Sequence, residues 1–326
     1  MNSYLVTGVA GFIGTKVCHD LLKAGNRVVG VDNLNAYYDV RLKEWRLAQL
    51  HQDFRDSHFH FERLDIEDRA SLEALFDQNV FDAVLHLASR AGVRYSLENP
   101  HVYSSTNISG TLNLLECMRA KDCNKMVLAS TSSLYAGQSM PFDETLAANE
   151  PLSPYAASKK SAELFAYSYH QLYGFDISVL RYFTVFGPAG RPDMSPFRFV
   201  RWAVEGETIK LFGDGSQSRD FTFVDDIARG TVLALKKVGY EIINLGGGRN
   251  PISLNSMIEK LDNLLDKSSN VEREPSHAAD MSETWADIEK AKRLLGWQPE
   301  FSFDEGLKKT VEWYLVNREW LKEIKI

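Results

Sequence analysis

The chain has 326 residues, of which 44% are hydrophobic and 25% are charged, and its formal net charge at pH 7 is −7. These fractions are typical of a globular protein, and the length favours two subdomains over a single core. The negative charge, without a basic tract, argues against nucleic acid as a partner, although local arginines can still bind a small anion.

The cysteines and the apolar segments bear on the compartment. Cys18, Cys117 and Cys123 are odd in number and lack the spacing of metal ligands, so we expect free thiols in a reducing compartment and no metal site. A strand begins by Ser3 without a charged and then apolar leader, and no apolar run is long enough to span a membrane. We therefore expect a cytoplasmic protein without a membrane partner.

The N-terminal segment has the pattern of a dinucleotide-binding unit. A strand at Tyr4–Thr7 precedes the glycines of Gly8-Val-Ala-Gly11-Phe-Ile-Gly14, and a helix over Phe12–Ala24 and a strand over Arg27–Asp32 follow. Glycines at these positions permit a tight turn and let the backbone approach a pyrophosphate at the helix N-terminus. Because the motif needs this strand–loop–helix–strand context, we predict a dinucleotide site here rather than an ordinary turn.

Asp32, at the end of the second strand, indicates which dinucleotide binds. A carboxylate at this position accepts hydrogen bonds from the adenosine ribose hydroxyls and repels a 2′-phosphate. No arginine follows it immediately. We therefore expect NAD rather than NADP.

Strands and helices then alternate as far as Arg181. Strands are predicted at 59–64, 82–86, 125–129 and 177–181, and helices at 69–78, 99–120 and 153–173. The alternation indicates an α/β fold with a doubly wound parallel sheet of the Rossmann type.

The alternation loosens after Arg181, where three prolines and a glycine fall between Pro188 and Pro196. We therefore predict an NAD-binding domain over residues 1–183 and, mainly over 184–326, a second and smaller α/β domain that binds the substrate. Residues 225–247 are expected to return to the first sheet. Helices that cap the smaller domain are predicted at 254–265, 288–295 and 304–313.

Tyr155-Ala-Ala-Ser-Lys159 is the clearest catalytic candidate. At a spacing of four residues, both side chains project from one face of the predicted helix. A free tyrosine has a pKa near ~10, and a cation one turn away favours the phenolate. The pair can then act as a base that takes a proton from an alcohol. Taken alone, the motif leaves open an exposed aromatic ring beside a solvated lysine.

A Thr-Ser-Ser sequence at residues 131–133 follows the predicted strand 125–129. Ligands of parallel sheets bind at the carboxyl ends of the strands. We therefore expect the Thr131 hydroxyl to meet Tyr155, so that the two groups share the proton of the substrate alcohol. A polar loop without chemistry is the alternative.

These motifs resemble those of the extended short-chain dehydrogenase/reductases that act on nucleotide sugars. The resemblance includes Asp32-Asn33 and Asp65-Ile66 and covers nearly the whole chain, continuing through 181–188, 213–221 and 285–297. Within that family, the stretches most similar to UDP-glucuronate 4-epimerases are 32–43, 91–100 and 190–194. One departure is His86-Leu-Ala-Ser89, where many relatives have a second alanine, and we expect little effect from it.

The resemblance implies a role for each matching residue. The catalytic threonine, tyrosine and lysine correspond to Thr131, Tyr155 and Lys159. The cofactor is NAD, and its implied contacts are Gly8, Gly11, Phe12, Ile13, Gly14, Asp32, Asn33, Asp65, Ile66, Leu87, Ala88, Asn107, Tyr155, Lys159 and Tyr182. The substrate is a UDP-sugar, and its implied contacts are Arg94, Ser132, Ser133, Thr184, Arg191 and Arg219.

Two of these arginines have alternative interpretations. The diphosphate is the implied ligand of Arg219, whose guanidinium can grip phosphate oxygens with two nitrogens. An ion pair with Asp220 or Asp225 is its alternative. For Arg191, the alternative is a loop residue that fixes Asp193.

The two serines after Thr131 separate the reactions of the family. The sugar dehydratases carry Asp-Glu at Ser132 and Ser133, and UDP-xylose synthases carry Glu at Ser133. Dehydration and decarboxylation are therefore disfavoured, and the implied reaction is NAD-dependent C4 epimerisation of UDP-glucuronate to UDP-galacturonate through a 4-keto sugar. That intermediate is a β-keto acid, and we expect Ser132, Ser133, Thr184 and Arg191 to hold its carboxylate away from the geometry that loses CO₂.

Several alternatives remain open at this point. They are a UDP-glucuronate decarboxylase forming UDP-xylose or a 4-keto-pentose, a 4-epimerase of UDP-glucose or a UDP-N-acetylhexosamine, a plain NAD-linked oxidoreductase, and a non-catalytic NAD(H) sensor. The resemblance also implies a homodimer through the apolar faces of helices 99–120 and 153–173. Burial of those faces in the core is the alternative.

Overall fold

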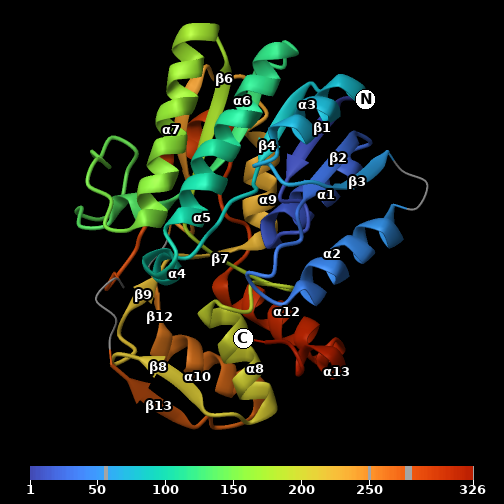
Figure 1. Cartoon of the computed structure of the whole chain (residues 1–326). Coiled ribbons are helices and arrows are strands. Elements are labelled where there is room, and N and C mark those ends of the chain that lie inside the picture. The colour runs from blue at the N-terminus through green and yellow to red at the C-terminus, as the bar shows by residue number, and fades with distance from the viewer. Residues whose placement is uncertain (55–57, 249–250, 276–280, 326) are drawn as a thin grey trace.

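A computed structural model describes residues 1–54, 58–248, 251–275 and 281–325, and a seven-stranded parallel sheet forms its centre (Figure 1). The strand order is β11-β6-β5-β4-β1-β2-β3. The strands are β1 (Ser3–Thr7), β2 (Arg27–Asp32), β3 (Phe59–Arg63), β4 (Ala83–His86), β5 (Lys125–Thr131), β6 (Asp176–Tyr182) and β11 (Tyr240–Leu245). From β1 the chain builds outward to β3 and then crosses to β4 and builds the other way, so the predicted doubly wound α/β fold is confirmed.

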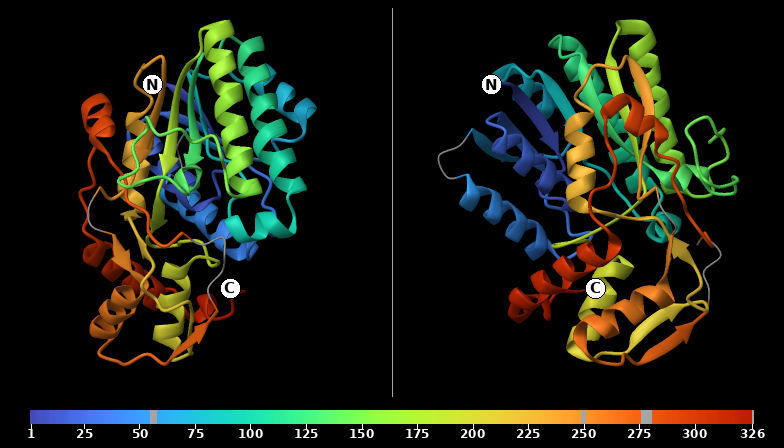
Figure 2. Two further views of the ribbon diagram at one scale, coloured as in Figure 1. Left: turned by 90° about the vertical axis from the view of Figure 1, so that its left-hand side faces the viewer. Right: turned by 180° about the vertical axis from the view of Figure 1, so that it is seen from behind.

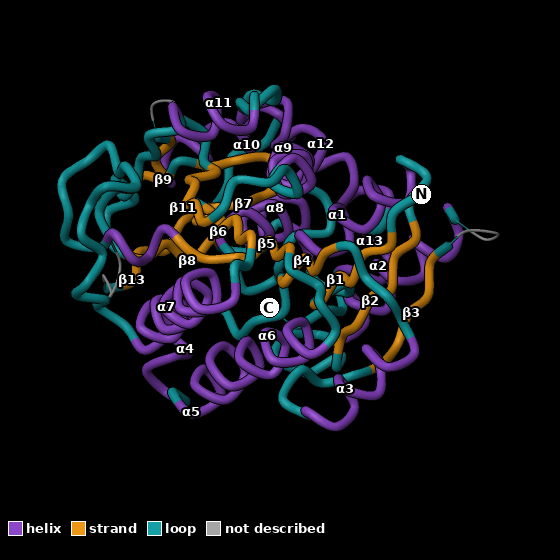
Figure 3. The backbone as a smooth tube through the Cα atoms, turned by 90° about the horizontal axis from the view of Figure 1, so that it is seen from above, coloured by secondary structure: helices purple, strands orange, loops and turns teal. Residues whose placement is uncertain are grey.

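Helices cover both faces of this sheet, as the view from above shows (Figure 3). One face carries α3 (Arg69–Gln78), α6 (Gly110–Ala120) and α7 (Pro154–Tyr173), and the other carries α1 (Phe12–Lys23), α2 (Val40–Asp53), α9 (Val224–Leu233) and α11 (Glu289–Leu295). Successive strand residues pack on opposite faces. In β1, Leu5 lies in the core under α3, α6 and α7, whereas Tyr4 and Val6 lie in the core under the other helices.

A second and smaller unit lies beyond the carboxyl ends of the large sheet (Figure 2). Its three short strand pairs are β7 (Thr184–Phe186) with β10 (Phe221–Phe223), β8 (Ile209–Phe212) with β13 (Val271–Glu274), and β9 (Ser218–Arg219) with β12 (Ile252–Ser253). Its helices are α8 (Ser195–Glu205), α10 (Leu254–Leu265), α12 (Phe303–Val316) and α13 (Arg318–Leu321). They enclose a separate apolar core that includes Phe186, Leu211 and Leu307.

Two predicted helices differ in the structure. The helix predicted at 288–295 was assigned to the smaller domain, which is wrong, because Ala291 and Leu295 of α11 pack into the core of the large sheet. The single helix predicted over 99–120 is interrupted before α6. A short helix, α4 (Val93–Glu98), ends just before that segment, and α5 (His101–Tyr103) and a π-helical stretch η1 (Ser104–Ser109) precede α6 within it.

Sequence periodicity missed α2 and α8 for identifiable reasons. The buried face of α2 contains Lys43 and Arg46, and these polar residues obscure its apolar repeat. Pro196 suggests a loop, but it lies in the first turn of α8, where proline is tolerated. No helix in the described parts of the chain is long and apolar enough to cross a membrane.

Candidate active site

A cavity of about 730 Å³ lies between the carboxyl ends of the large sheet and the smaller unit. Loops that follow β1 to β6 form one side of it, and α8, β8 and β9 contribute to the other. Each residue that the sequence predicted for the site lines this cavity, with the exception of Asn107. The structure therefore brings together residues from Gly8 to Arg219 that the chain separates widely.

The glycine loop forms one wall of the cavity and needs its glycines for space. Gly8 has a φ of +72°, and a Cβ atom added to it would lie 2.7 Å from the backbone nitrogen of Ala88. A Cβ at Gly14 would lie 2.1 Å from the carbonyl oxygen of Gly8. Neither glycine can therefore be replaced by a residue with a side chain unless the backbone shifts. The start of α1 lines the cavity beside this loop. This arrangement fits a pyrophosphate bound at a helix N-terminus.

Asp32 lines the cavity beside the glycine loop. Its Oδ1 accepts a hydrogen bond from the backbone N–H of Leu34 (2.8 Å), and its Oδ2 accepts one from Ala10 (3.2 Å). The buried ammonium of Lys43, a residue that the sequence does not predict for the site, lies 3.9 Å from Oδ1. Backbone donors therefore fix the orientation of the Asp32 carboxylate at the wall of the cavity.

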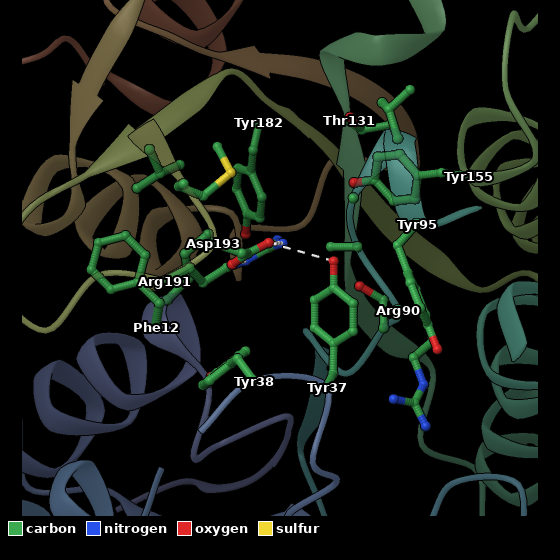
Figure 4. Close-up of a pocket in the computed structure, with 18 of the residues that line it drawn as sticks. Phe12, Tyr37, Tyr38, Arg90, Tyr95, Thr131, Tyr155, Tyr182, Arg191 and Asp193 are labelled. Carbon is green, nitrogen blue, oxygen red and sulfur yellow. Dashed lines mark hydrogen bonds and ion pairs between the residues drawn. The ribbon is translucent and has the colours of Figure 1, made fainter. Parts of the chain in front are cut away.

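The first turns of α7 place the catalytic candidates. The side chain of Ser153 caps this helix by accepting a hydrogen bond from the backbone N–H of Ala156 (3.1 Å). Tyr155 then lies in the first turn and Lys159 one turn later, where its ammonium donates to the carbonyl oxygen of Ala129 (2.9 Å). Thr131 ends β5 beside Tyr155 (Figure 4), so the predicted meeting of the two side chains is present.

The ionisation of this group differs from the expectation. Burial raises the pKa of Tyr155 above its ordinary value, and a hydrogen bond with the Thr131 side chain and the charge of Arg191 oppose that rise without cancelling it. Burial also lowers the pKa of Lys159 to about 8, and the charge of Glu163 opposes that change. The motif spacing predicts that Lys159 lowers the pKa of Tyr155. In the structure, burial outweighs the groups that lower this pKa, and the charge of Arg191 is one of those groups.

A buried ion pair behind the catalytic candidates was not predicted from the sequence. Glu163 of α7 accepts two hydrogen bonds from the Arg181 guanidinium, at 2.9 and 2.8 Å, and one from the Ser130 hydroxyl at 2.6 Å. All three side chains are almost fully buried. The pair therefore fastens α7 to β5 next to Thr131 and to β6.

Asn107, which is a predicted contact of the cofactor, does not line the cavity. It is buried in η1, where its side chain bonds to both backbone groups of Arg90 and donates to the Ser158 hydroxyl (2.9 Å). It thus holds the wall that contains Arg90 against the helix that carries Tyr155 and Lys159. The interruption of the helical repeat at η1 is not visible in the residue pattern.

Arg191 lies across the cavity from Tyr155 and forms a two-point ion pair with Asp193, at 3.0 and 2.5 Å (Figure 4). The hydroxyl of Tyr37 donates to Asp193 at 3.4 Å. Arg191 therefore fixes Asp193, as its alternative interpretation states, and it also lines the cavity with Thr184, while its contact with the substrate stays a prediction. Tyr37 is not among the residues that the sequence predicts for the site, although it lies within the stretch 32–43.

Two arginines line the cavity from different units. The guanidinium of Arg94, from α4, lies 4.2 Å from the ring centre of Phe212 in β8. Arg219, from β9, donates to the carbonyl oxygen of Ser218. Of the two carboxylates considered as alternative partners of Arg219, Asp225 pairs with Lys16 at 2.9 Å. Positive charge from both units therefore lines a cavity that can bind a diphosphate.

Comparison with known proteins gives concordant matches. Residues 4–246 match the model of the NAD dependent epimerase/dehydratase family. A UDP-glucuronate 4-epimerase of Thermodesulfobacterium geofontis is 60% identical over 326 residues, which is 100% of both chains. A protein of Rhizobium meliloti described as a probable UDP-glucuronate 4-epimerase is 38% identical, with 96% of this chain and 97% of that one covered.

Solved structures agree with these matches. UDP-glucuronic acid 4-epimerase from Bacillus cereus, in complex with UDP-glucuronic acid and NAD, superposes with a TM-score of 0.91 at 38% identity, covering 97% of this chain and 99% of that one. UDP-glucose 4-epimerase from Thermotoga maritima, with UDP-glucose, gives a TM-score of 0.88 at 33% identity over 97% and 99% of the two chains.

Proposed function

The chain belongs to the NAD dependent epimerase/dehydratase family, and on that premise we propose that it is a UDP-glucuronate 4-epimerase that forms UDP-galacturonate. One observation carries the proposal. Tyr155 and Arg191 line the same cavity from opposite sides, so that a proton acceptor for an alcohol and a cation for a carboxylate face the same space. A hexuronate has both groups on one ring.

The residues of the cavity fit NAD. The glycines at Gly8 and Gly14 have no room for a Cβ atom, the start of α1 lines the cavity, and backbone N–H groups hold the Asp32 carboxylate at the cavity wall. A glycine loop at a helix N-terminus suits a pyrophosphate, and a carboxylate at this position suits the ribose hydroxyls. When bound there, NAD supplies the acceptor and later the donor of the C4 hydride, so the cycle needs no external redox partner.

Proton transfer at C4 is assigned to Tyr155 with Thr131. The Tyr155 phenolate takes the proton of the C4 hydroxyl as the alcohol becomes a ketone. After the 4-keto sugar has rotated so that its other face meets the cofactor, the phenol returns the proton to the C4 oxygen. Because burial raises the pKa of Tyr155, its phenolate is a strong base once formed. The Thr131 hydroxyl and the charges of Arg191 and Lys159 are the groups that would stabilise it.

The carboxylate is assigned to the side opposite Tyr155. Once C4 is a ketone, CO₂ is lost easily if the bond from C5 to the carboxylate stands perpendicular to the ketone plane. Hydroxyl groups of Ser132, Ser133 and Thr184, with the Arg191 guanidinium, are proposed to hold the carboxylate away from that orientation. The Asp193 pair fixes the plane of that guanidinium. Arg219 and Arg94 are proposed to bind the diphosphate.

One incubation tests this function against its alternatives. The protein is mixed with UDP-glucuronate and a trace of NAD, and the products are identified by NMR. UDP-galacturonate in large excess over NAD supports the proposal. A ketone formed in amounts equal to NADH would indicate an oxidoreductase, and CO₂ with a UDP-pentose would indicate a decarboxylase. The same incubation is repeated with UDP-glucose in place of UDP-glucuronate. Turnover of UDP-glucose alone would indicate a neutral-sugar epimerase, and NAD binding without turnover of either sugar would indicate a sensor.

We propose that the protein is cytoplasmic and forms a homodimer. We also propose that its two domains meet between residues 183 and 184. Large apolar side chains on α7 support a dimer, since Leu164, Tyr167 and Leu172 expose 55%, 47% and 71% of their area. Sedimentation of the protein should give twice the mass of the chain, and Leu164→Glu should shift it to monomer. A monomeric unmodified protein would contradict the proposal.

A further inference from the structure

The Arg46 side chain of α2 is buried and joins the glycine loop to the segment that precedes Arg191. Its Nε donates to the carbonyl oxygen of Ala189 (3.1 Å), and its Nη2 donates to Ala189 (2.6 Å) and Gly190 (3.2 Å). Its Nη1 donates to the carbonyl oxygen of Ala10 (3.1 Å) and to the Tyr38 hydroxyl (2.7 Å). A guanidinium has five N–H groups, and these five bonds match that number.

The partners of Arg46 favour a role in geometry over a role in stability. Within the described parts of the chain, its hydrogen bonds go to carbonyl and phenol oxygens, and none goes to a carboxylate. A charge buried without an opposite charge costs stability unless dipoles compensate it. A neutral apolar residue would avoid that cost, but it could not hold three carbonyl groups at fixed positions.

The carbonyl groups that Arg46 binds belong to two of the loops that line the cavity. Ala10 lies in the glycine loop, and its own N–H donates to Asp32. Ala189 has a φ of +55°, a left-handed conformation that is unfavourable for alanine and persists where the surroundings hold it. Two N–H groups of Arg46 converge on its carbonyl oxygen. Arg191 follows Ala189 by two positions in the chain.

We propose that Arg46 is a positioning residue that fixes the position of Arg191 relative to the glycine loop. This inference rests on the proposed epimerase function. The distance between the C4 atom and the carboxylate is fixed within the sugar, so the protein must place Arg191 at a matching distance from the cofactor. Arg46 links the two loops through Ala10 and Ala189–Gly190. If that link is lost, Arg191 moves relative to C4, and the carboxylate can rotate toward the orientation that loses CO₂.

Arg46→Lys is the first test, performed on the protein with NAD. Lysine keeps the charge, but its single nitrogen cannot span carbonyl groups on two loops. We expect the KM for UDP-glucuronate to rise about tenfold, the equivalent of one charge-assisted hydrogen bond, and kcat to change less. The ratio of UDP-pentose to UDP-galacturonate should rise as well. Arg41→Lys is the matched control on the same helix, because Arg41 is exposed and pairs with Asp39, and it should change neither quantity.

A double-mutant cycle with Arg191→Ala distinguishes positioning from a general loss of structure. If Arg46 acts through Arg191, then Arg46→Lys should add little to the effect of Arg191→Ala on KM and on the product ratio. Full additivity of the two effects would overturn the inference. If Arg46→Lys does not fold, Tyr38→Phe carries the test, because it removes one acceptor from Nη1, and about a threefold shift in the same direction is expected.

The outcomes separate this inference from the function on which it rests. An unmodified protein that does not epimerise UDP-glucuronate would overturn both. An unmodified protein that does so, together with an Arg46→Lys variant whose KM and product ratio are unchanged, would overturn the role of Arg46 alone.

Discussion

Replacing Glu163 by glutamine should destabilise the protein strongly, although Glu163 does not line the cavity. The substitution keeps the shape of the side chain but leaves the Arg181 guanidinium buried without its counter-charge. Breaking a buried pair in this way costs about 3–5 kcal/mol. With an unfolding entropy of about 2.1 cal/mol/K per residue over the 326 residues, this corresponds to a fall in Tm of roughly 4–7 °C.

Thermal unfolding followed by circular dichroism measures this effect. Glu73→Gln is the control, because Glu73 forms an exposed pair with Arg69 at 2.7 Å and its loss should hardly change Tm. A double variant, Glu163→Met with Arg181→Met, removes both charges and should recover most of the lost stability. The reasoning would be refuted if Glu163→Gln lowered Tm no more than Glu73→Gln does.

Four further predictions concern the catalytic cycle. Tyr155→Phe should lower kcat for UDP-glucuronate by more than about tenfold, which corresponds to ~1.4 kcal/mol in the activation barrier. Titration with NAD should show nearly unchanged binding. A variant that retains more than a tenth of the wild-type kcat would contradict the assignment of Tyr155 as the base. Because the pKa of Tyr155 is raised and that of Lys159 is lowered to about 8, the state with phenolate and ammonium together gains population with pH until Lys159 titrates. The pH profile of kcat should therefore rise about tenfold per pH unit and level off near pH 8. In Glu163→Gln this break should move to lower pH, because the Glu163 charge raises the pKa of Lys159. A profile that is flat below pH 8 would exclude Tyr155 phenolate with Lys159 ammonium as the active state. Asp32→Ala should narrow the gap between NAD and NADP affinities, measured by titrating the protein stripped of nucleotide, and a wild-type preference for NADP would overturn the assignment. Thr184→Val, which removes a hydroxyl at nearly constant volume, should raise either the KM for UDP-glucuronate or the yield of UDP-pentose measured by NMR. If both the KM and the product ratio are unchanged, Thr184 does not bind the carboxylate.

The sequence determined the parts of this protein that depend on local pattern. Strand and helix periodicity predicted the parallel sheet, and the glycine motif predicted a loop in which Gly8 and Gly14 have no space for a Cβ atom. Because parallel strands end at one edge of the sheet, the sequence also indicated that Thr131 and Tyr155 would meet.

Only the tertiary structure decided which distant groups meet and how burial changes them. Arg46 binds Ala189 across 143 positions of the chain, and no local pattern marks either residue as a partner. The placement of α11 on the large sheet and of Asn107 behind the cavity wall likewise follows from packing. Burial also reverses the expected direction of the pKa shift of Tyr155. Periodicity and motif spacing report which face of an element is apolar, whereas desolvation and long-range hydrogen bonds depend on atoms that the chain brings together only on folding.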